Sequence, residues 1–358
     1  MTATVGWDIG GAHLKAALAE GGELTALFQI STPLWQGVDR LVGALEEILE
    51  QLPSPRCHAV TMTGELCDRF PSRREGVAEI LSLFQTKVAP DPVVVFRLPG
   101  RLVPLERLSL QQAWPVIASA NWLVSGWYLA GRLEEALFVD LGSTTTDLLP
   151  IREGRPSFRG SDDLSRLASG ELLYLGVSRT PLATLADRVP FGGEWVPVMN
   201  ELFATTADLF RITRELAAHL DQDPTADGGP KDRPASARRL ARMVGRDLEM
   251  ATLEAWELLA RFWRERLLQK LTEGCFRLVT GGISGKAPLV GAGSGRFLLP
   301  EVARRLGRPY LDANELFRWR GEGELTPADL MPACALALLA SEWNRVGMNR
   351  SQESGEPP

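Results

Sequence analysis

The sequence predicts an α/β protein with two domains, and three observations support this prediction. Strand and helix signals alternate along the chain, which is typical of the α/β class. The 358 residues, of which 45% are apolar and 23% charged, are enough for two hydrophobic cores. The alternating pattern also starts again near residue 136, where a new pair of strands follows a long helical stretch.

In the first half we expect strands at 3–9, 13–20, 23–30 and 57–62, and helices at 38–51, 74–86 and 107–131. Residues 113–131 carry no charge and reach the length of a short membrane span. The run also contains a proline and several polar residues, so we expect a buried helix whose polar groups face a cleft. Asn121, within this run, is a candidate substrate ligand.

In the second half we expect strands at 136–141, 144–151, 276–280 and 287–291, and helices at 247–273, 296–306 and 327–344. Residues 221–236 are polar and rich in glycine and proline, so we expect a mobile surface loop there, either a linker or a lid. The polar tail 346–358 is expected to be disordered. We place one domain at residues 1–131 with 327–345, and the other at residues 132–326.

The charge and the cysteine usage exclude several classes of function. A formal net charge of −6 argues against a nucleic-acid surface, which normally carries a basic excess. The four cysteines lack a paired short spacing, so neither a disulfide framework nor a zinc site is expected. The N-terminal residues show no basic region followed by an apolar run, so we expect no signal peptide and a cytoplasmic protein without a membrane partner.

Two turns in corresponding places share one pattern: VGWDIGGAHLKAAL from residue 5 and VDLGSTTTDLL from residue 139. Each reads as a strand, then Asp-x-Gly-small residue, then a strand. Glycine lets backbone N–H groups approach an anion closely, and an aspartate suits a magnesium ion held directly or through water. The alternative is two plain hairpins, in which a glycine such as Gly142 tolerates a positive φ. The candidate metal ligands are Asp8 and Asp140, and the candidate phosphate contacts are Gly10, Gly11, Gly142, Ser143, Thr144 and Thr145.

A third glycine-rich segment, TGGISGKAPLVGAGSGR at residues 280–296, lies between a predicted strand and a predicted helix. The N-terminus of that helix can face a phosphate or a ribose, with Gly281 and Gly282 as candidate contacts, although many such segments are ordinary turns. Two Asp-Gly turns, a connecting helix, a late glycine-rich loop and a final apolar helix together resemble the actin-like superfamily of sugar kinases and heat-shock ATPases. That resemblance implies two ribonuclease-H-like domains around a central cleft.

Within this superfamily, five segments resemble the hydantoinase A/oxoprolinase family: WDIGGAHLKAA, TMTGELCDRF, ASANW, VDLGSTTTDLLPI and RRLARMVGRD. They are most similar to its branch in methanofuran and methylofuran biosynthesis, which is linked to tetrahydromethanopterin-dependent one-carbon transfer. The resemblance extends from residue 5 to about residue 340. It implies a transferase similar to the aminomethylfuran–phenol ether synthases, which join an aminomethyl-furanmethanol diphosphate to the phenol of a tyramine or tyrosine unit and release diphosphate.

This chemistry accounts for a phosphate cradle without ATP. Backbone amides and magnesium can stabilise charge on the leaving diphosphate, and a base near the phenol oxygen should help because the phenol has a reference pKa of about 10. The segment MTGELCDRF places Glu65 after a strand as the candidate base, with Asp8 and Asp140 completing the catalytic set. The alternatives are that Glu65 only stabilises a helix N-terminus, and that the chain is an ATP-dependent kinase or a hydantoinase-type hydrolase.

The remaining candidates are basic. In a strand, His13 and Lys15 share one face and could reach the same anion, although a structural histidine and a solvated lysine are the plainer interpretations. Arg238 and Arg242 share a face of a predicted helix and could receive the diphosphate or a glutamyl carboxylate; most such runs are only solvated faces. The oligomeric state stays open, with a homo-oligomer allowed.

Overall fold

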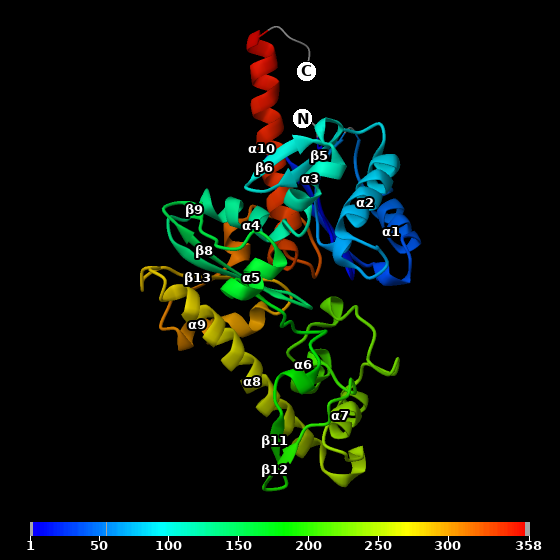
Figure 1. Cartoon of the computed structure of the whole chain (residues 1–358), viewed down its shortest axis with the longest axis vertical. Helices are drawn as coiled ribbons and strands as arrows, with labels where there is room; N and C mark the ends of the chain where they lie inside the picture. The colour runs from blue at the N-terminus through cyan, green and yellow to red at the C-terminus, as the bar shows by residue number, and fades with distance from the viewer. Residues whose placement is uncertain (1–2, 55, 355–358) are drawn as a thin grey trace. The chain divides into compact units, whose positions relative to one another are not determined.

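The computed structural model describes residues 3–54 and 56–354 and divides into two compact units (Figure 1). Unit 1 comprises Met1–Glu134, Ile151–Ser165 and Ala313–Pro358, and unit 2 comprises Glu135–Pro150 and Arg166–Asp312. The expected domains differ from this division mainly at 151–165 and 313–326, both of which belong to unit 1.

Unit 1 is built on a six-stranded sheet in the order β3-β2-β1-β4-β5-β6. Its strands are β1 (Ala3–Ile9), β2 (His13–Glu20), β3 (Glu23–Ser31), β4 (Arg56–Met62), β5 (Val93–Arg97) and β6 (Arg101–Pro104). The first three form an antiparallel meander, and β4 and β5 then run parallel to β1. The sequence analysis predicted the first four strands and missed β5 and β6.

The helices of unit 1 are α1 (Asp39–Leu49), α2 (Arg73–Val88), α3 (Leu110–Ile117), α4 (Asn121–Ala130) and α10 (Met331–Ser354). The single helix expected over 107–131 is two helices, because the chain takes a left-handed conformation at Ser119, with φ 50°. Helix α10 packs on β1 and continues to Ser354; residues 355–358, the end of the tail expected to be disordered, lie outside the described residues. Gly6 permits this contact, since a Cβ there would lie 2.2 Å from Ala333 O.

Unit 2 contains a five-stranded sheet in the order β10-β8-β7-β13-β14. Its strands are β7 (Ala136–Leu141), β8 (Thr146–Arg152), β10 (Leu172–Leu173), β13 (Leu289–Ala292) and β14 (Tyr310–Asp312). Strand β9 (Arg155–Pro156) pairs with Ile151 and Arg152, the last residues of β8, which belong to unit 1. Strand β13 runs parallel to both β7 and β14. Numbered along the chain within this sheet, its strands lie in the order 3-2-1-4-5. The strands of unit 1 from β3 to β5 lie in the same order.

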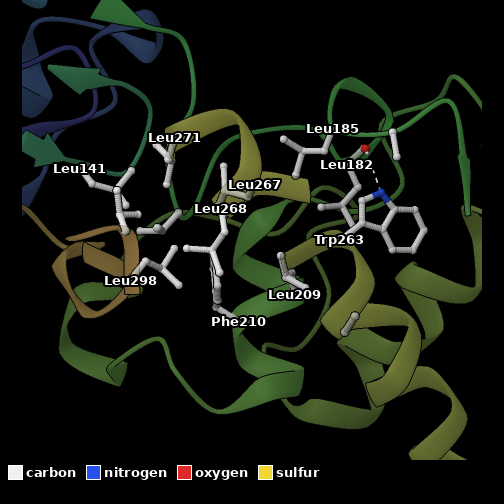
Figure 2. Close-up of a cluster of buried hydrophobic side chains, with 14 of the residues drawn as sticks. Leu141, Leu182, Leu185, Leu209, Phe210, Trp263, Leu267, Leu268, Leu271 and Leu298 are labelled. Atoms are coloured by element: carbon white, nitrogen blue, oxygen red, sulfur yellow. Dashed lines mark hydrogen bonds between the residues drawn. The ribbon is translucent and has the colours of Figure 1, made fainter. Parts of the chain in front are cut away.

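The remaining elements are helices α5 (Asp163–Ser169), α6 (Thr206–Thr213), α7 (Arg233–Arg242), α8 (Leu253–Val279) and α9 (Leu299–Arg305), and a ribbon of β11 (Arg188–Phe191) and β12 (Glu194–Pro197). Figure 2 shows leucines of α8 packed beside residues of the sheet and of α6, while Trp263 Nε1 donates to Leu182 O at 3.1 Å. The prediction of a strand at 276–280 is wrong. Leu271, Cys275 and Leu278 continue the buried stripe of α8 at helical spacing, so this segment completes the helix.

Across residues 3–54 and 56–354, no helix is both long enough and apolar enough to cross a lipid bilayer. The uncharged run at 113–131 accordingly contributes α3 and α4 to unit 1, with most of α4 buried.

Candidate functional sites in the two units

The turn of unit 1 joins β1 to β2 and holds Asp8 just before it. Gly10 N donates to His13 O at 3.0 Å and closes the turn; a Cβ on Gly10 would lie 2.9 Å from the same oxygen. Asp8 is 5% exposed, and Asn121 Nδ2 donates to its Oδ1 at 3.5 Å. The Asn121 side chain is itself oriented by Trp122 N, which donates to Asn121 Oδ1 at 2.9 Å. The structure thus brings together two of the predicted residues, Asp8 and Asn121.

The two basic candidates of this turn lie on β2. Lys15 is the cross-strand partner of Asp8, so the two side chains share one face of the sheet. Lys15 Nζ donates to the backbone oxygen of Asp329 at 3.3 Å, which directs the ammonium group toward the segment before α10. His13 is 8% exposed and begins the strand. Gly11 O accepts from Leu34 N at 3.0 Å, so the turn is anchored to the chain that follows β3.

Glu65, which follows β4, is a buried acid with 1% of its surface exposed. Ser119 Oγ donates to Glu65 Oε1 at 2.9 Å, whereas Glu65 Oε2 has no hydrogen-bond partner among the described residues. Burial raises the pKa of Glu65, although the hydrogen bond from Ser119 and the charge of Arg73 oppose this shift. Gly76 of α2 packs directly on Glu65, since a Cβ there would lie 2.8 Å from Glu65 O. A buried carboxyl group with one unsatisfied oxygen and a raised pKa is a candidate for acid–base chemistry.

The left-handed residue between α3 and α4 is what presents the hydroxyl to Glu65. Ser119 adopts φ 50°, a conformation that costs energy for a residue with a Cβ. The same short connection supplies Asn121 to Asp8, two residues later. The segment ASANW therefore positions both polar partners of unit 1. Its pattern drew attention to Asn121, whereas the role of Ser119 required the backbone conformation.

The turn of unit 2 repeats the closing hydrogen bond of the first. Gly142 N donates to Thr145 O at 2.9 Å, in the same relation as Gly10 and His13. Gly142 does not have the positive φ that the hairpin interpretation supposed, and a Cβ there would lie 3.4 Å from Thr145 O, at ordinary contact distance. The Ser143 and Thr144 hydroxyl oxygens lie 3.4 Å apart in this turn.

Asp140, at the end of β7, lies against a glycine loop that follows β13. A Cβ on Gly293 would be 2.5 Å from Asp140 Oδ1, and Gly293 has φ 88°. Gly295 N donates to Leu141 O at 2.8 Å and fixes this loop to the strand. The late glycine-rich segment therefore does reach the first strand of the unit, through residues 291–295.

Gly281 and Gly282 instead form the turn after α8, exposed to solvent. Gly282 has φ 103°, and a Cβ built there meets no atom within 4 Å. These two glycines thus suit the end of a helix, where a left-handed residue is common. The part of the segment that lies against Asp140 is Gly293, and the role of Gly281 and Gly282 as phosphate contacts stays a prediction.

The sequence analysis missed a segment that supports the turn of unit 2. A Cβ on Gly176 would lie 2.3 Å from Ser143 O, so the two backbones are in direct contact. Ser178 N and Arg179 N both donate to Ser143 O, at 3.1 and 2.9 Å. The Arg179 guanidinium lies 3.4 Å from Thr144 Oγ1. The sequence LGVSRT at 175–180 offered a weak signal: a glycine followed by hydroxyl and basic residues after a strand.

Arg179 also influences an acid in the segment expected to be a mobile loop. Asp223 is 6% exposed, and burial raises its pKa while the charges of Arg179 and Lys231 oppose the shift. Asp227, further along, accepts from Arg239 at 3.0 Å. Part of 221–236 is therefore packed and ion-paired.

Arg238 and Arg242 lie exposed on α7 with acidic neighbours of their own. Arg238 pairs with Asp227 at 3.6 Å and Arg242 with Asp247 at 2.7 Å. Arg239, between them, is buried and bonds to Asp208 at 2.8 Å. Arg179, rather than either predicted arginine, is the cation seen beside the turn of unit 2.

Within the described part of the chain, no three histidine, cysteine, aspartate or glutamate side chains gather closely enough to hold a metal ion. Asp8 and Asp140 are single carboxylates at their respective strand ends. That donor set fits a magnesium ion bound mainly by phosphate oxygens and water, which magnesium readily keeps as ligands.

Two units with the same strand order, each with an Asp-x-Gly turn after its first strand, define the doubled ribonuclease-H-like fold of the actin-like ATPase class. A solved nucleotide-free structure of acetone carboxylase, described as an enzyme of ATP-dependent acetone carboxylation, shares this fold. The alignment has a TM-score of 0.53 and 11% sequence identity, and covers 85% of this chain and 67% of that one. The predicted fold class is confirmed.

The profile of the Hydantoinase/oxoprolinase family matches residues 56–314, so the chain belongs to this family. It is 31% identical over 247 residues to the (4-{4-[2-(gamma-L-glutamylamino)ethyl]phenoxymethyl}furan-2-yl)methanamine synthase of Methanocaldococcus jannaschii, covering 69% of this chain and 72% of that protein. The synthase of the same name from Methanococcus vannielii is 34% identical over 121 residues, which are 34% of this chain and 54% of that protein. These relatives confirm the predicted branch, methanofuran biosynthesis, and indicate an enzyme of the transferase type.

Proposed function

We propose that the protein joins the furfuryl carbon of an aminomethyl-furanmethanol diphosphate to the phenol oxygen of a tyramine or tyrosine unit and releases diphosphate. The product would serve methanofuran or methylofuran biosynthesis and one-carbon metabolism. The observation that carries the proposal is the 31% identity to a synthase whose name describes a phenoxymethyl-furan. That name contains an aryl ether on a furfuryl carbon, the bond that this condensation forms.

The proposed reaction exchanges one carbon–oxygen bond for another. The bond from the furfuryl carbon to diphosphate breaks, and its electron pair leaves with the diphosphate. A lone pair of the phenol oxygen forms the aryl ether, and the phenol proton passes to a base. Because the furan ring can stabilise positive charge on the carbon, the protein must mainly stabilise negative charge on the leaving group.

The turn of unit 2 has the donors for this task. Ser143 and Thr144 supply hydroxyl groups, and the Arg179 guanidinium lies 3.4 Å from Thr144 Oγ1. Guanidinium groups form strong, charge-assisted hydrogen bonds with phosphate oxygens. Asp8 and Asp140, each at the end of the first strand of its own unit, are the residues that could hold magnesium through water, and a bound ion would neutralise part of the charge of the diphosphate.

We assign Glu65 the role of proton acceptor. Its raised pKa makes the carboxylate a stronger base and narrows the gap to a phenol, whose reference pKa is about 10. Glu65 is 1% exposed, so the proton would arrive through the Ser119 hydroxyl, which donates to Glu65 and keeps lone pairs for a phenol proton.

Phosphorus NMR tests the reaction directly. The purified protein with magnesium is given either the furfuryl diphosphate with a phenolic acceptor, or ATP. We expect diphosphate and the aryl ether in the first case only. Asp140→Asn should suppress diphosphate release strongly, whereas Asp187→Asn, an exposed aspartate of the same unit, should leave it unchanged. Turnover of ATP without ether formation would instead support a kinase or hydrolase.

A further inference from the structure

Unit 1 contains a pocket of about 570 Å³ that none of the residues assigned above lines. Its walls come from the start of α2, the β5–β6 connection, α3 and the segment before α5. Its lining includes Arg97, Trp114, Phe158 and Asp162, together with Ala118, which precedes the Ser119 that bonds to Glu65. A pocket of this volume suits a small organic molecule.

The walls are fixed by interactions that do not involve a ligand. Leu98 N donates to Val116 O at 2.8 Å and ties the β5–β6 connection to α3. Trp127 Nε1 donates to Pro99 O at 2.9 Å. Phe158 packs edge-on against Trp122, with ring centroids 5.2 Å apart. The pocket is therefore largely preformed, which lowers the entropic cost of binding.

The lining combines aromatic side chains with two basic residues, Arg73 and Arg97, and one acidic residue, Asp162. Trp114 and Phe158 line the pocket, and aromatic side chains are favourable packing partners for a planar ring. Arg97 Nε is buried and has no hydrogen-bond partner among the described residues, so it lacks an acceptor that a ligand could supply. Asp162 receives hydrogen bonds from Ser165, and these bonds lower its pKa, so it is a carboxylate at neutral pH.

The third charged lining residue already has an ion-pair partner. Arg73 forms an ion pair with Asp163, next to Asp162 in the chain. This leaves Arg97 to donate to a ligand carboxylate and Asp162 to accept from a ligand ammonium group. A ligand with an aromatic ring and an α-amino-acid head matches this set: ring against Trp114 and Phe158, carboxylate at Arg97, ammonium at Asp162.

The pocket is also connected to the proposed base. Ala118 lines it, and the next residue, Ser119, holds Glu65 through a 2.9 Å hydrogen bond. Arg73 lines it as well, and its charge acts on the pKa of Glu65. A ring in this pocket would therefore lie along the wall that leads to the Ser119–Glu65 pair.

We propose that this pocket binds the phenolic acceptor in its γ-glutamylated form, with Arg97 and Asp162 selecting the amino-acid head of the glutamyl group. This rests on the proposed function, since the γ-glutamyl phenol is the acceptor that would yield the compound in the relatives' name. Arg97 and Asp162 are then determinants of substrate specificity, and the free amine is a poor acceptor.

Calorimetric titration tests the inference without turnover, using γ-glutamyltyramine and tyramine as probes. We expect at least a tenfold preference for γ-glutamyltyramine, about the value of one charge-assisted hydrogen bond. Arg97→Gln should abolish the preference, and Asp162→Asn should reduce it. The matched control is Arg101→Gln, because Arg101 is the exposed cross-strand partner of Arg97 and lies outside the pocket lining.

Equal binding of the two probes to the wild type, or an intact preference in a folded Arg97→Gln variant, would overturn the inference. If Arg97→Gln does not fold, Asp162→Asn decides alone by the same criterion. A preference that depends on Arg97, together with no ether formation by phosphorus NMR, would uphold the pocket and reject the proposed reaction. Ether formation with no dependence on Arg97 would uphold the reaction and reject the pocket.

Discussion

Gly176 leaves no room for a side chain against the turn of unit 2. A Cβ added there would lie 2.3 Å from Ser143 O, 2.4 Å from Ser143 C and 2.5 Å from Thr144 N, all of them backbone atoms. Because favourable contacts between heavy atoms begin at about 3.5 Å, Gly176→Ala must displace one of the two segments by about 1 Å. The displaced segments are the ones that Ser178 N and Arg179 N hold together through Ser143 O.

Overpacking of this kind costs about 1–3 kcal/mol, so the melting temperature should fall by about 2–12 °C for a unit of this size. Diphosphate affinity, measured by calorimetry with magnesium, should fall about tenfold or more, because both turn hydroxyls and the Arg179 guanidinium move. The matched control is Gly142→Ala in the same turn. Its Cβ would meet only Thr145 O, at 3.4 Å, and its φ is not positive.

Gly142→Ala should therefore be neutral or stabilising by about 0.4–1 kcal/mol. The comparison refutes the reasoning if Gly176→Ala keeps both its melting temperature and its affinity for diphosphate. Equal damage by the two alanines would also refute it, since only one of them meets backbone atoms at impossible distances.

Three further predictions concern single side chains. Ser143→Ala should lower diphosphate affinity roughly fivefold to tenfold, because it removes one hydroxyl worth about 1 kcal/mol and leaves the backbone in place. An unchanged calorimetric affinity would support the interpretation of this turn as a plain hairpin. The raised pKa of Glu65 means that the stability contributed by its protonated form is complete below the ordinary pKa of 4.5 and is lost as the pH rises through the folded pKa. Glu65→Gln should therefore flatten the pH dependence of urea-unfolding stability above about pH 4.5; parallel curves would contradict this. Burial lowers the pKa of His58 to about 4, although Asp91 opposes this shift. Between about pH 6.5 and pH 4 the unfolded chain therefore binds a proton that the folded chain does not. The urea midpoint of unfolding should fall as the pH is lowered from about 6.5 toward about 4, and His58→Asn should reduce that fall.

The parts of the fold that sequence could predict are those set by local pattern. Strands β1 to β4 and both Asp-x-Gly turns follow from apolar runs and turn residues within a few positions of one another. The segment 276–280 resembled a strand because of its Phe, Leu, Val and Thr residues, yet burial of Leu278 one turn beyond Cys275 keeps it in α8. Tertiary contacts outweighed a local preference that is worth little by itself.

The candidate site was less predictable because its contacts join distant segments. Gly176 meets Ser143 across 33 positions, and no local pattern reports such an approach of two backbones. Arg238 and Arg242 do share a helix face, but the sequence did not show that Asp227 and Asp247 would neutralise them. Glu65 was predicted from its place after a strand, whereas the hydroxyl that holds it depends on the left-handed backbone at Ser119.

The two turns share the same closing backbone hydrogen bond and differ in the groups around it, and that difference predicts different roles for them. In unit 1 the neighbours of Asp8 are the amide of Asn121 and, across the strands, Lys15, whose ammonium group is bonded to the backbone oxygen of Asp329. In unit 2 the turn carries consecutive hydroxyl side chains, and a guanidinium stands 3.4 Å from one of them. Hydroxyl and guanidinium groups donate to phosphate oxygens, while a buried carboxylate repels them unless a cation intervenes. Under the proposed function we therefore expect direct anion binding at the turn of unit 2, and at the turn of unit 1 only binding through a cation at Asp8.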